Sequence, residues 1–159
     1  MRVYLSSDHA GFELKEALSS WLRARPAEEG LEVVDLGPAT AERCDYPERA
    51  WALAEAVAGD EGSRGVLVCG TGIGVSVAAN RHPRIRAALA HDAFTAEMAR
   101  RHNDAQVLCL GARVVGEGVA LHALEAFLRA DFEGGRHATR VEQLGALGAG
   151  GAGGAGGEA

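Results

Sequence analysis

Short apolar runs alternate with amphipathic segments along most of the chain. Between the runs, apolar residues recur three or four positions apart, as Leu14, Leu18 and Leu22 do, and this spacing predicts helices with one buried face. The run at 66–68 has no polar alternation, which is typical of a strand covered by helices on both sides. Strands are predicted at residues 3–5, 31–36, 66–68, 85–90 and 106–110.

Helices and strands alternate in this way up to a closing helix around residues 120–128. Such alternation implies right-handed βαβ crossovers. We therefore expect a Rossmann-like three-layer α/β/α sandwich with a five-stranded parallel sheet. Local signals agree, because Pro26 and Gly30 would end the first helix, Pro47 suits the first turn of the second, and Asp92 is placed to cap a later one.

The chain of 159 residues fits one domain, which we place at residues 1–147. Residues 148–159 are almost wholly glycine and alanine. Because this segment has no large apolar side chain to bury, we expect it to be a flexible tail.

Composition and charge limit the partners and the cellular compartment that we expect for the protein. A formal net charge of −6 argues against general affinity for nucleic acid, so any anion site must be local. Three cysteines without a CxxC pair, in a chain with no signal-peptide pattern, indicate free thiols in a reducing compartment, which we take to be the cytoplasm. No apolar stretch reaches the roughly 18 residues that a membrane-spanning helix needs, so no membrane partner is expected.

The third strand runs into a glycine-rich stretch, CGTGIG at 69–74, and then into a helix. Gly70, Gly72 and Gly74 allow a tight turn and a close approach of backbone N–H groups to an anion. Cys69 ends the strand, at the edge where open α/β sheets bind ligands. Simpler explanations stay open. The cysteine could be a small core residue, and the loop, which lacks the full GxGxxG spacing and a following Lys-Ser or Lys-Thr, could be only a turn.

Further chemically suggestive residues are expected at the carboxyl ends of the predicted strands. Besides Cys69 and its loop they are Asp8, His9, Tyr46, His102 and Asn103. Each has a structural alternative: Asp8 could cap the first helix, Tyr46 could be a packing residue, and His102 with Asn103 could merely end a helix. Cys44 and Cys109 have no partner spacing and are taken as structural.

Basic residues follow at Arg113, Arg136 and Arg140. Arg136 and Arg140 are four positions apart, so on a helix both guanidinium groups would point the same way and suit a phosphate group. The alternative is a solvated charged surface. The set favours a phosphorylated small molecule over a protein as the partner.

Taken together, these residues belong to motifs that resemble the ribose-5-phosphate isomerase B family, which also includes galactose-6-phosphate and allose-6-phosphate isomerases. The resemblance runs in unbroken order over residues 1–144. The motifs are SDHAG at 7–11, DYP at 45–47, CGTGIG at 69–74, ANR at 79–81, RAAL at 86–89, HNDA at 102–105, LGAR at 110–113, and FEGGRH at 132–137 followed by Arg140.

The resemblance implies that an aldose phosphate and its ketose are interconverted without a metal or an organic cofactor. Cys69 would be the base that moves a proton between C1 and C2. His102 would help to open the furanose ring, with Asp8 nearby on the sugar hydroxyls. Thr71 and the N–H groups of the glycine loop would hold the enediolate, a role that fits preorganised donors at a site of developing negative charge.

The remaining roles implied by the resemblance concern binding and assembly. Tyr46 and Asn103 would contact the sugar. The phosphate would be bound by His9, Arg113, Arg136 and Arg140. The family also implies a homodimer, or a dimer of dimers, whose active sites are shared between subunits.

The chain departs from the family pattern at a few positions. Val75 stands where one branch of the family has a glutamate base, so the cysteine keeps that role here. Arg84 replaces a common glycine, and Arg101 replaces a common acid. Two other functions stay open: isomerisation of a four- or six-carbon sugar phosphate, and a non-catalytic sugar-phosphate-binding module, which would need neither Cys69 nor His102.

Overall fold

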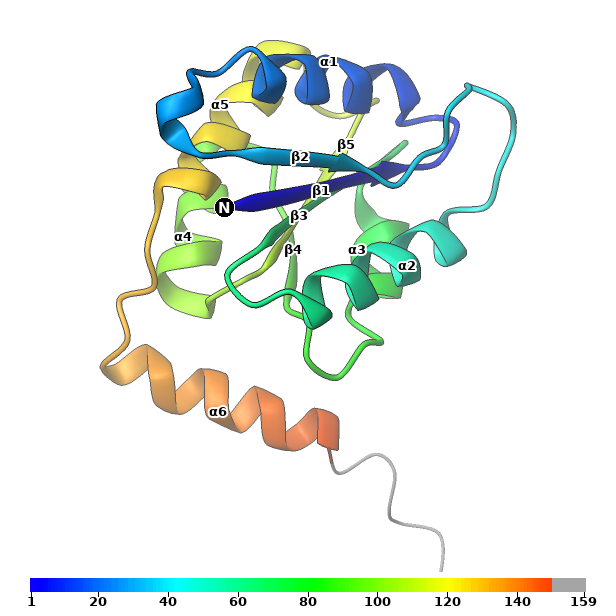
Figure 1. Cartoon of the computed structure of the whole chain (residues 1–159). Coiled ribbons are helices and arrows are strands. Elements are labelled where there is room, and N and C mark those ends of the chain that lie inside the picture. Colours follow the sequence, from blue (N-terminus) through cyan, green and yellow to red (C-terminus); the bar gives the residue numbers. More distant parts are fainter. Residues whose placement is uncertain (150–159) are drawn as a thin grey trace, which may run out of the picture.

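The computed structural model describes residues 1–149 and has the expected architecture (Figure 1). The strands are β1 (Arg2–Ser7), β2 (Glu32–Asp35), β3 (Arg64–Cys69), β4 (Ala87–Leu89) and β5 (Val107–Gly111). The helices are α1 (Phe12–Arg23), α2 (Tyr46–Gly59), α3 (Ile73–Ala79), α4 (Ala93–Asn103), α5 (Glu117–Arg129) and α6 (Arg136–Ala149).

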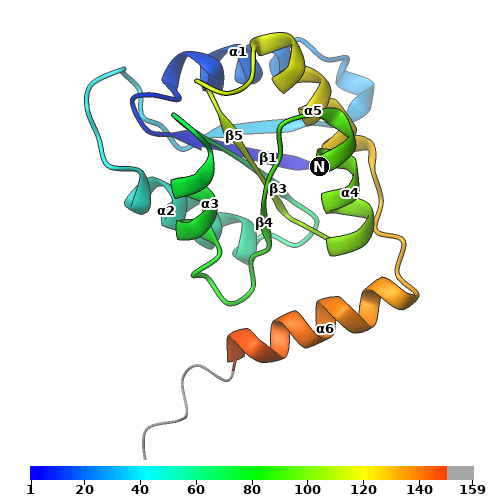
Figure 2. The same cartoon turned by 180° about the vertical axis from the view of Figure 1, so that it is seen from behind.

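All five strands form one sheet in the order β2-β1-β3-β5-β4, and every neighbouring pair is parallel. Helices α1, α4 and α5 cover one face, where Leu18, Phe127 and Val66 belong to one buried apolar cluster. Helices α2 and α3 cover the other, where Leu53 and Val75 are buried. The three layers are visible from both sides in Figures 1 and 2, which confirms the predicted α/β/α sandwich.

Strands β1 and β3 are longer than the sequence predicts, with six residues each instead of three, whereas β4 is shorter, with three residues instead of the expected six. The side chain of Asn80 accounts for part of this. Its amide nitrogen donates to the carbonyl of Ala87 at 2.8 Å, and its oxygen accepts from the Ala87 N–H at 2.9 Å. The amide thereby satisfies the first residue of the strand, and the chain before it forms a turn in which the Ile85 N–H donates to the His82 carbonyl.

The last helix, α6, stands apart from the sandwich and contacts α4 (Figures 1 and 2). It begins at Arg136 and continues to Ala149, two residues past the predicted domain boundary. The rest of the predicted tail, residues 150–159, lies outside the described residues. No helix within residues 1–149 combines the length and apolar character needed to cross a membrane.

Candidate active site

The order of the sheet fixes where a ligand can bind. Strand β1 lies between β2 and β3, so the chain moves to opposite sides after β1 and after β2. In open α/β sheets the crevice at such a switch point, at the carboxyl ends of the strands, is the usual ligand site. A cleft of about 410 Å³ lies there, lined by Asp8, His9, Ala10, Tyr46, Cys69, Gly70, Thr71, Ile73, Gly74 and Arg113.

Cys69 ends β3 at the floor of this cleft and is 5% exposed. Its sulfur accepts a hydrogen bond from the N–H of Gly72 at 3.1 Å. A donor aimed at sulfur stabilises negative charge there, and the thiolate is the reactive form of cysteine. Cys109, on the neighbouring strand, provides a contrast. Complete burial is the main cause that raises the pKa of its thiol, and the nearby Cys69 is the second, so the Cys109 thiol stays protonated. Cys69 is thus both part of the core and open to the cleft.

The glycine loop has the tight geometry expected from its sequence. Gly72 has a φ of 77°, in the left-handed region that favours glycine. Gly74 leaves room for the ring of Tyr46, since a Cβ added at Gly74 would lie 2.8 Å from the ring's Cζ atom. Tyr46 therefore covers the loop at the rim of the cleft and is 39% exposed.

Asp8 and His9 are fixed by the turn that follows β1. Asp8 is buried, and its Oδ1 accepts from the N–H of Gly11 at 3.0 Å. Gly11, and not Asp8, is the N-cap residue of α1, so the capping alternative is wrong although Asp8 does stabilise the turn. His9 Nδ1 lies 3.1 Å from the carbonyl of Cys44. Because a carbonyl can only accept, Nδ1 carries a proton, which leaves Nε2 for a ligand.

Arg113 supplies positive charge to the same cleft. Its guanidinium lies above Gly70, with Nη1 3.4 Å from where a Cβ of that glycine would be. Its backbone N–H donates to the Gly70 carbonyl at 3.0 Å, which ties the β5 end to the loop. Within residues 1–149 no carboxylate forms an ion pair with Arg113. The guanidinium is therefore available to an anionic ligand such as phosphate.

The expectation that His102 and Asn103 lie with these residues at the carboxyl ends of the strands is wrong for a single chain. Both end α4, which starts after β4 and leads back to the start of β5. His102 is nine residues past the start of this helix, and each residue rises about 1.5 Å, so the helix carries His102 about 14 Å toward the amino edge of the sheet. Arg136 and Arg140, on α6, lie on the same side, since α6 packs on α4.

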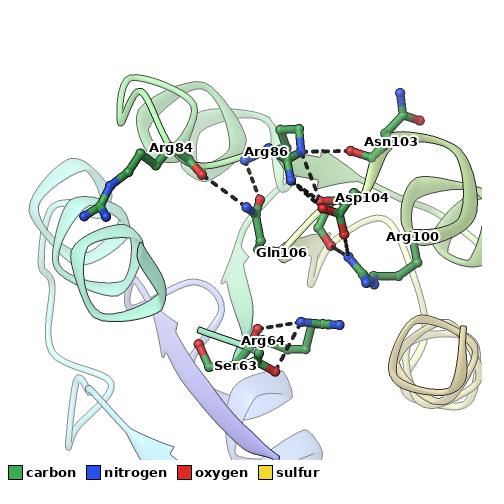
Figure 3. A network of polar contacts seen from close by, with 10 residues as sticks. Ser63, Arg64, Arg84, Arg86, Arg100, Asn103, Asp104 and Gln106 are labelled. Atoms are coloured by element: carbon green, nitrogen blue, oxygen red, sulfur yellow. Dashed lines mark hydrogen bonds and ion pairs between the residues drawn. The ribbon is translucent and has the colours of Figure 1, made fainter. Parts of the chain in front are cut away.

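Asn103 is exposed beside a network of charged residues (Figure 3). Its carbonyl accepts from Arg86 Nε at 2.9 Å, while its amide points away from the network. Arg86 and Arg100 both bind the carboxylate of Asp104, each at 2.8 Å. The network thus holds the end of α4 and leaves the Asn103 side chain free of it.

His102 stands in a cluster with two residues to which the sequence analysis gave no role. Its ring is stacked on that of His137, with centroids 4.3 Å apart and planes inclined by 2°. Glu133 lies beside both rings, and Arg101 binds its carboxylate. The only signal in the sequence was the position of Glu133 and His137 within one of the family motifs, because their contact with His102 depends on how α6 docks.

Two imidazoles and a carboxylate are also a set that can bind a transition metal, and the nearest ligand atoms of His102, Glu133 and His137 lie within 4.8 Å of one another. Neighbouring basic side chains disfavour metal binding by this cluster. Arg101 binds Glu133, and Arg136 Nε donates to His137 Nε2 at 3.4 Å. A cation would have to displace or face these charges, so we assign no metal to the cluster.

Comparison with known proteins agrees with the motifs. A model of the ribose/galactose isomerase family matches residues 3–144. The ribose-5-phosphate isomerase B of Escherichia coli strain K12 is 44% identical over 145 residues, covering 91% of this chain and 95% of that protein. The D-erythrulose-4-phosphate isomerase of Pectobacterium atrosepticum is 40% identical over 146 residues, covering 91% and 93%.

Solved structures of ribose-5-phosphate isomerase B proteins are also similar to this chain. The ribose-5-phosphate isomerase B of Clostridium thermocellum superimposes with a TM-score of 0.87 at 45% identity, over 92% of this chain and 97% of that one. The Mycoplasma genitalium ribose-5-phosphate isomerase B with bound ribulose-5-phosphate gives 0.85 at 38% identity, over 92% and 95%. The chain therefore belongs to the ribose/galactose isomerase family and is an aldose–ketose isomerase.

Proposed function

We propose that the enzyme interconverts ribose 5-phosphate and ribulose 5-phosphate through an enediolate, without a metal, and that Cys69 is the base. The observation that carries this proposal is the hydrogen bond from the Gly72 N–H to the Cys69 sulfur, on the floor of a cleft that also holds Asp8 and Arg113. A thiol that can act as a base lies beside a carboxylate and a guanidinium that can bind phosphate. This combination suits proton transfer next to the carbonyl of a sugar phosphate.

In the forward direction the Cys69 thiolate removes the proton from C2 of the open-chain aldose. The electron pair forms the C1–C2 double bond, and O1 takes the negative charge. A proton then moves from O2 to O1, and the thiol returns its proton to C1, which leaves the carbonyl at C2. Thr71 is suited to the charged intermediate, because its side chain is exposed to the cleft and its backbone N–H has no hydrogen-bond partner among residues 1–149.

Binding roles follow from the walls of the cleft. Arg113 and His9 Nε2 would hold the phosphate, at a distance from C1 and C2 that lets phosphate binding orient the reacting carbons. Asp8 and Tyr46 would contact the sugar hydroxyls. The glycines Gly70, Gly72 and Gly74 let the loop approach the substrate closely.

The remaining four residues of the proposed site come from a second copy of the chain. His102, Asn103, Arg136 and Arg140 lie away from the cleft of their own chain, as the direction of α4 requires. Apolar side chains beside the cleft support a partner surface, since Ile73 is 55% exposed and Val77 is 56% exposed on α3. We propose a homodimer, or a dimer of such dimers, in which α6 of one subunit reaches the cleft of the other.

One comparison supports a second candidate substrate. The relative named D-erythrulose-4-phosphate isomerase is 40% identical to this chain, so a four-carbon substrate competes with the five-carbon one. The deciding assay offers the purified enzyme four-, five- and six-carbon aldose phosphates in the presence of EDTA. We expect ribose 5-phosphate to give the highest kcat/KM and EDTA to have no effect. A higher kcat/KM for another aldose would assign that substrate, and turnover of none would leave a sugar-phosphate-binding module.

A further inference from the structure

The ring of His102 is held from one side by a second histidine. His137 is 5% exposed and stacks on His102 with almost parallel planes. Such a stack restricts rotation of the His102 ring about its own side-chain bonds, because tilting the ring would collide with a buried neighbour. His102 itself keeps 35% of its side chain exposed, so the stacked ring remains accessible to a ligand.

Glu133 divides its two carboxylate oxygens between different partners. Oε1 accepts from Arg101 Nε at 2.6 Å, and the same oxygen pairs with a second nitrogen of that guanidinium. Oε2 faces the imidazoles instead, 3.8 Å from Nε2 of His102 and 3.7 Å from Nε2 of His137. These separations are longer than a hydrogen bond, and they place the negative charge of Glu133 beside both rings.

The surroundings of the pair shift the pKa values of His137 and Glu133. Burial lowers the pKa of His137, and the neighbouring His102, Arg136 and Arg140 lower it further against the opposing effect of Glu133. Hydrogen bonding to Arg101 lowers the pKa of Glu133, which keeps its carboxylate anionic. Burial therefore disfavours the protonated form of His137, and the anionic carboxylate of Glu133 also faces Nε2 of His102.

We propose that Glu133 and His137 are positioning residues of His102 in the opening of the sugar ring. The proposal rests on the function proposed above. In that step His102 gives its proton to the ring oxygen O4, the C1–O4 bond breaks, and the O1 hydroxyl passes its proton to the Asp8 carboxylate as the C1 carbonyl forms. His137 fixes the plane of the donor ring, and the Glu133 carboxylate faces the Nε2 atom of that ring.

Ring opening can be measured separately from the proton transfer at carbon. Ribose 5-phosphate closes into a furanose through O4 and must be opened. Ribulose 5-phosphate cannot form a furanose, because the O5 that would close the ring carries the phosphate. Exchange of its C1 hydrogen with D₂O therefore reports the Cys69 step alone, whereas turnover of ribose 5-phosphate reports both steps.

The test uses Glu133→Gln and His137→Asn. We expect kcat/KM for ribose 5-phosphate to fall about 10- to 100-fold in each, below the full effect of losing an acid catalyst, while the exchange rate of ribulose 5-phosphate stays within about 3-fold of wild type. Glu97→Gln is the matched control. Glu97 binds the same Arg101, at 2.7 Å, but is not part of the stacked cluster, so both rates should be unchanged.

Three outcomes would overturn the proposal: no loss in either variant, an equal loss in both assays, or the same loss in Glu97→Gln. His102→Asn separates this failure from that of the proposed function. If His102→Asn itself leaves ribose 5-phosphate turnover intact, the ring-opening role of His102 is wrong. If His102→Asn loses turnover of ribose 5-phosphate but Glu133→Gln and His137→Asn do not, then Glu133 and His137 take no part in ring opening. In a His102→Asn/Glu133→Gln double variant we expect no further loss, because the carboxylate acts through the ring.

Discussion

The N–H of Gly72 donates a hydrogen bond to the sulfur of Cys69 at 3.1 Å. This contact needs the left-handed backbone of Gly72, whose φ is 77°. A Cβ there would also lie 2.5 Å from Leu89 Cδ1. The turn that brings the donor to the sulfur is thus available to glycine and not to a residue with a side chain.

If Cys69 is the base, Cys69→Ala should lower kcat by about 10²- to 10⁴-fold, the usual size of a general-base contribution, while the sugar phosphate still binds. The measurement is steady-state turnover together with substrate affinity by calorimetry. Cys109→Ala is the matched control, because its thiol is buried and protonated, and it should alter stability without a comparable loss of kcat. Near-normal turnover in Cys69→Ala would leave Cys69 a core residue only.

The contact between Gly74 and Tyr46 predicts an effect on substrate binding. In Gly74→Ala the new methyl group would lie 2.8 Å from Tyr46 Cζ, so the ring must move away from the loop. We expect KM to rise about 5- to 30-fold, equivalent to losing one or two kcal/mol of binding, with a smaller change in kcat.

Gly118→Ala is the control for this variant, because an added Cβ at Gly118 meets nothing within 4 Å. It should leave KM unchanged. A Tyr46→Ala/Gly74→Ala double variant should show no higher KM than Tyr46→Ala alone. A further rise in the double variant would mean that the methyl group acts on something other than the tyrosine.

How much of this site the sequence could predict depends on the range of the contacts involved. Cys69 and Asp8 follow strands, and the strand pattern alone brings the ends of β1 and β3 to one edge. His102 was assigned to that edge too, yet the direction of a crossover helix carries it to the other side. Its stacking on His137 was not predictable, since that contact forms only when α6 docks on α4.

The N-terminus of α4 gives a pH-dependent contribution to stability. Asp92 Oδ1 accepts from the Thr95 N–H at 2.7 Å, as the sequence predicted for a capping residue. Hydrogen bonds from the Thr95 backbone, and then from its side chain, lower the pKa of Asp92 below its ordinary 3.8. A lowered carboxylate pKa stabilises the folded state above the ordinary value, and this stability is lost as the pH falls through the folded-state pKa.

Asp92→Asn keeps an oxygen that can cap the helix but removes the titration. The Tm of wild type should therefore exceed that of Asp92→Asn near neutral pH, and the difference should shrink toward zero as the pH falls from about 6 to about 2. Thermal melts of both proteins over this range measure it. A Tm difference independent of pH would show that the charge of Asp92 makes no contribution.

Cys69 and Arg136 lie on different sides of one chain, so the shared site can be tested by combining two inactive chains in one dimer. A Cys69→Ala chain and an Arg136→Ala chain, each nearly inactive alone, are co-expressed with different affinity tags, and the mixed dimer is purified through both tags. If each site takes Cys69 from one subunit and Arg136 from the other, one site of the mixed dimer carries both lesions and the other carries none. Activity should then return to about half that of a wild-type dimer, provided that the two sites act independently.

If each site belonged to one chain, every site of the mixed dimer would carry a lesion. A purified mixed dimer without recovered activity would therefore rule out the shared site, and the phosphate would have to be held by His9 and Arg113 of the same chain.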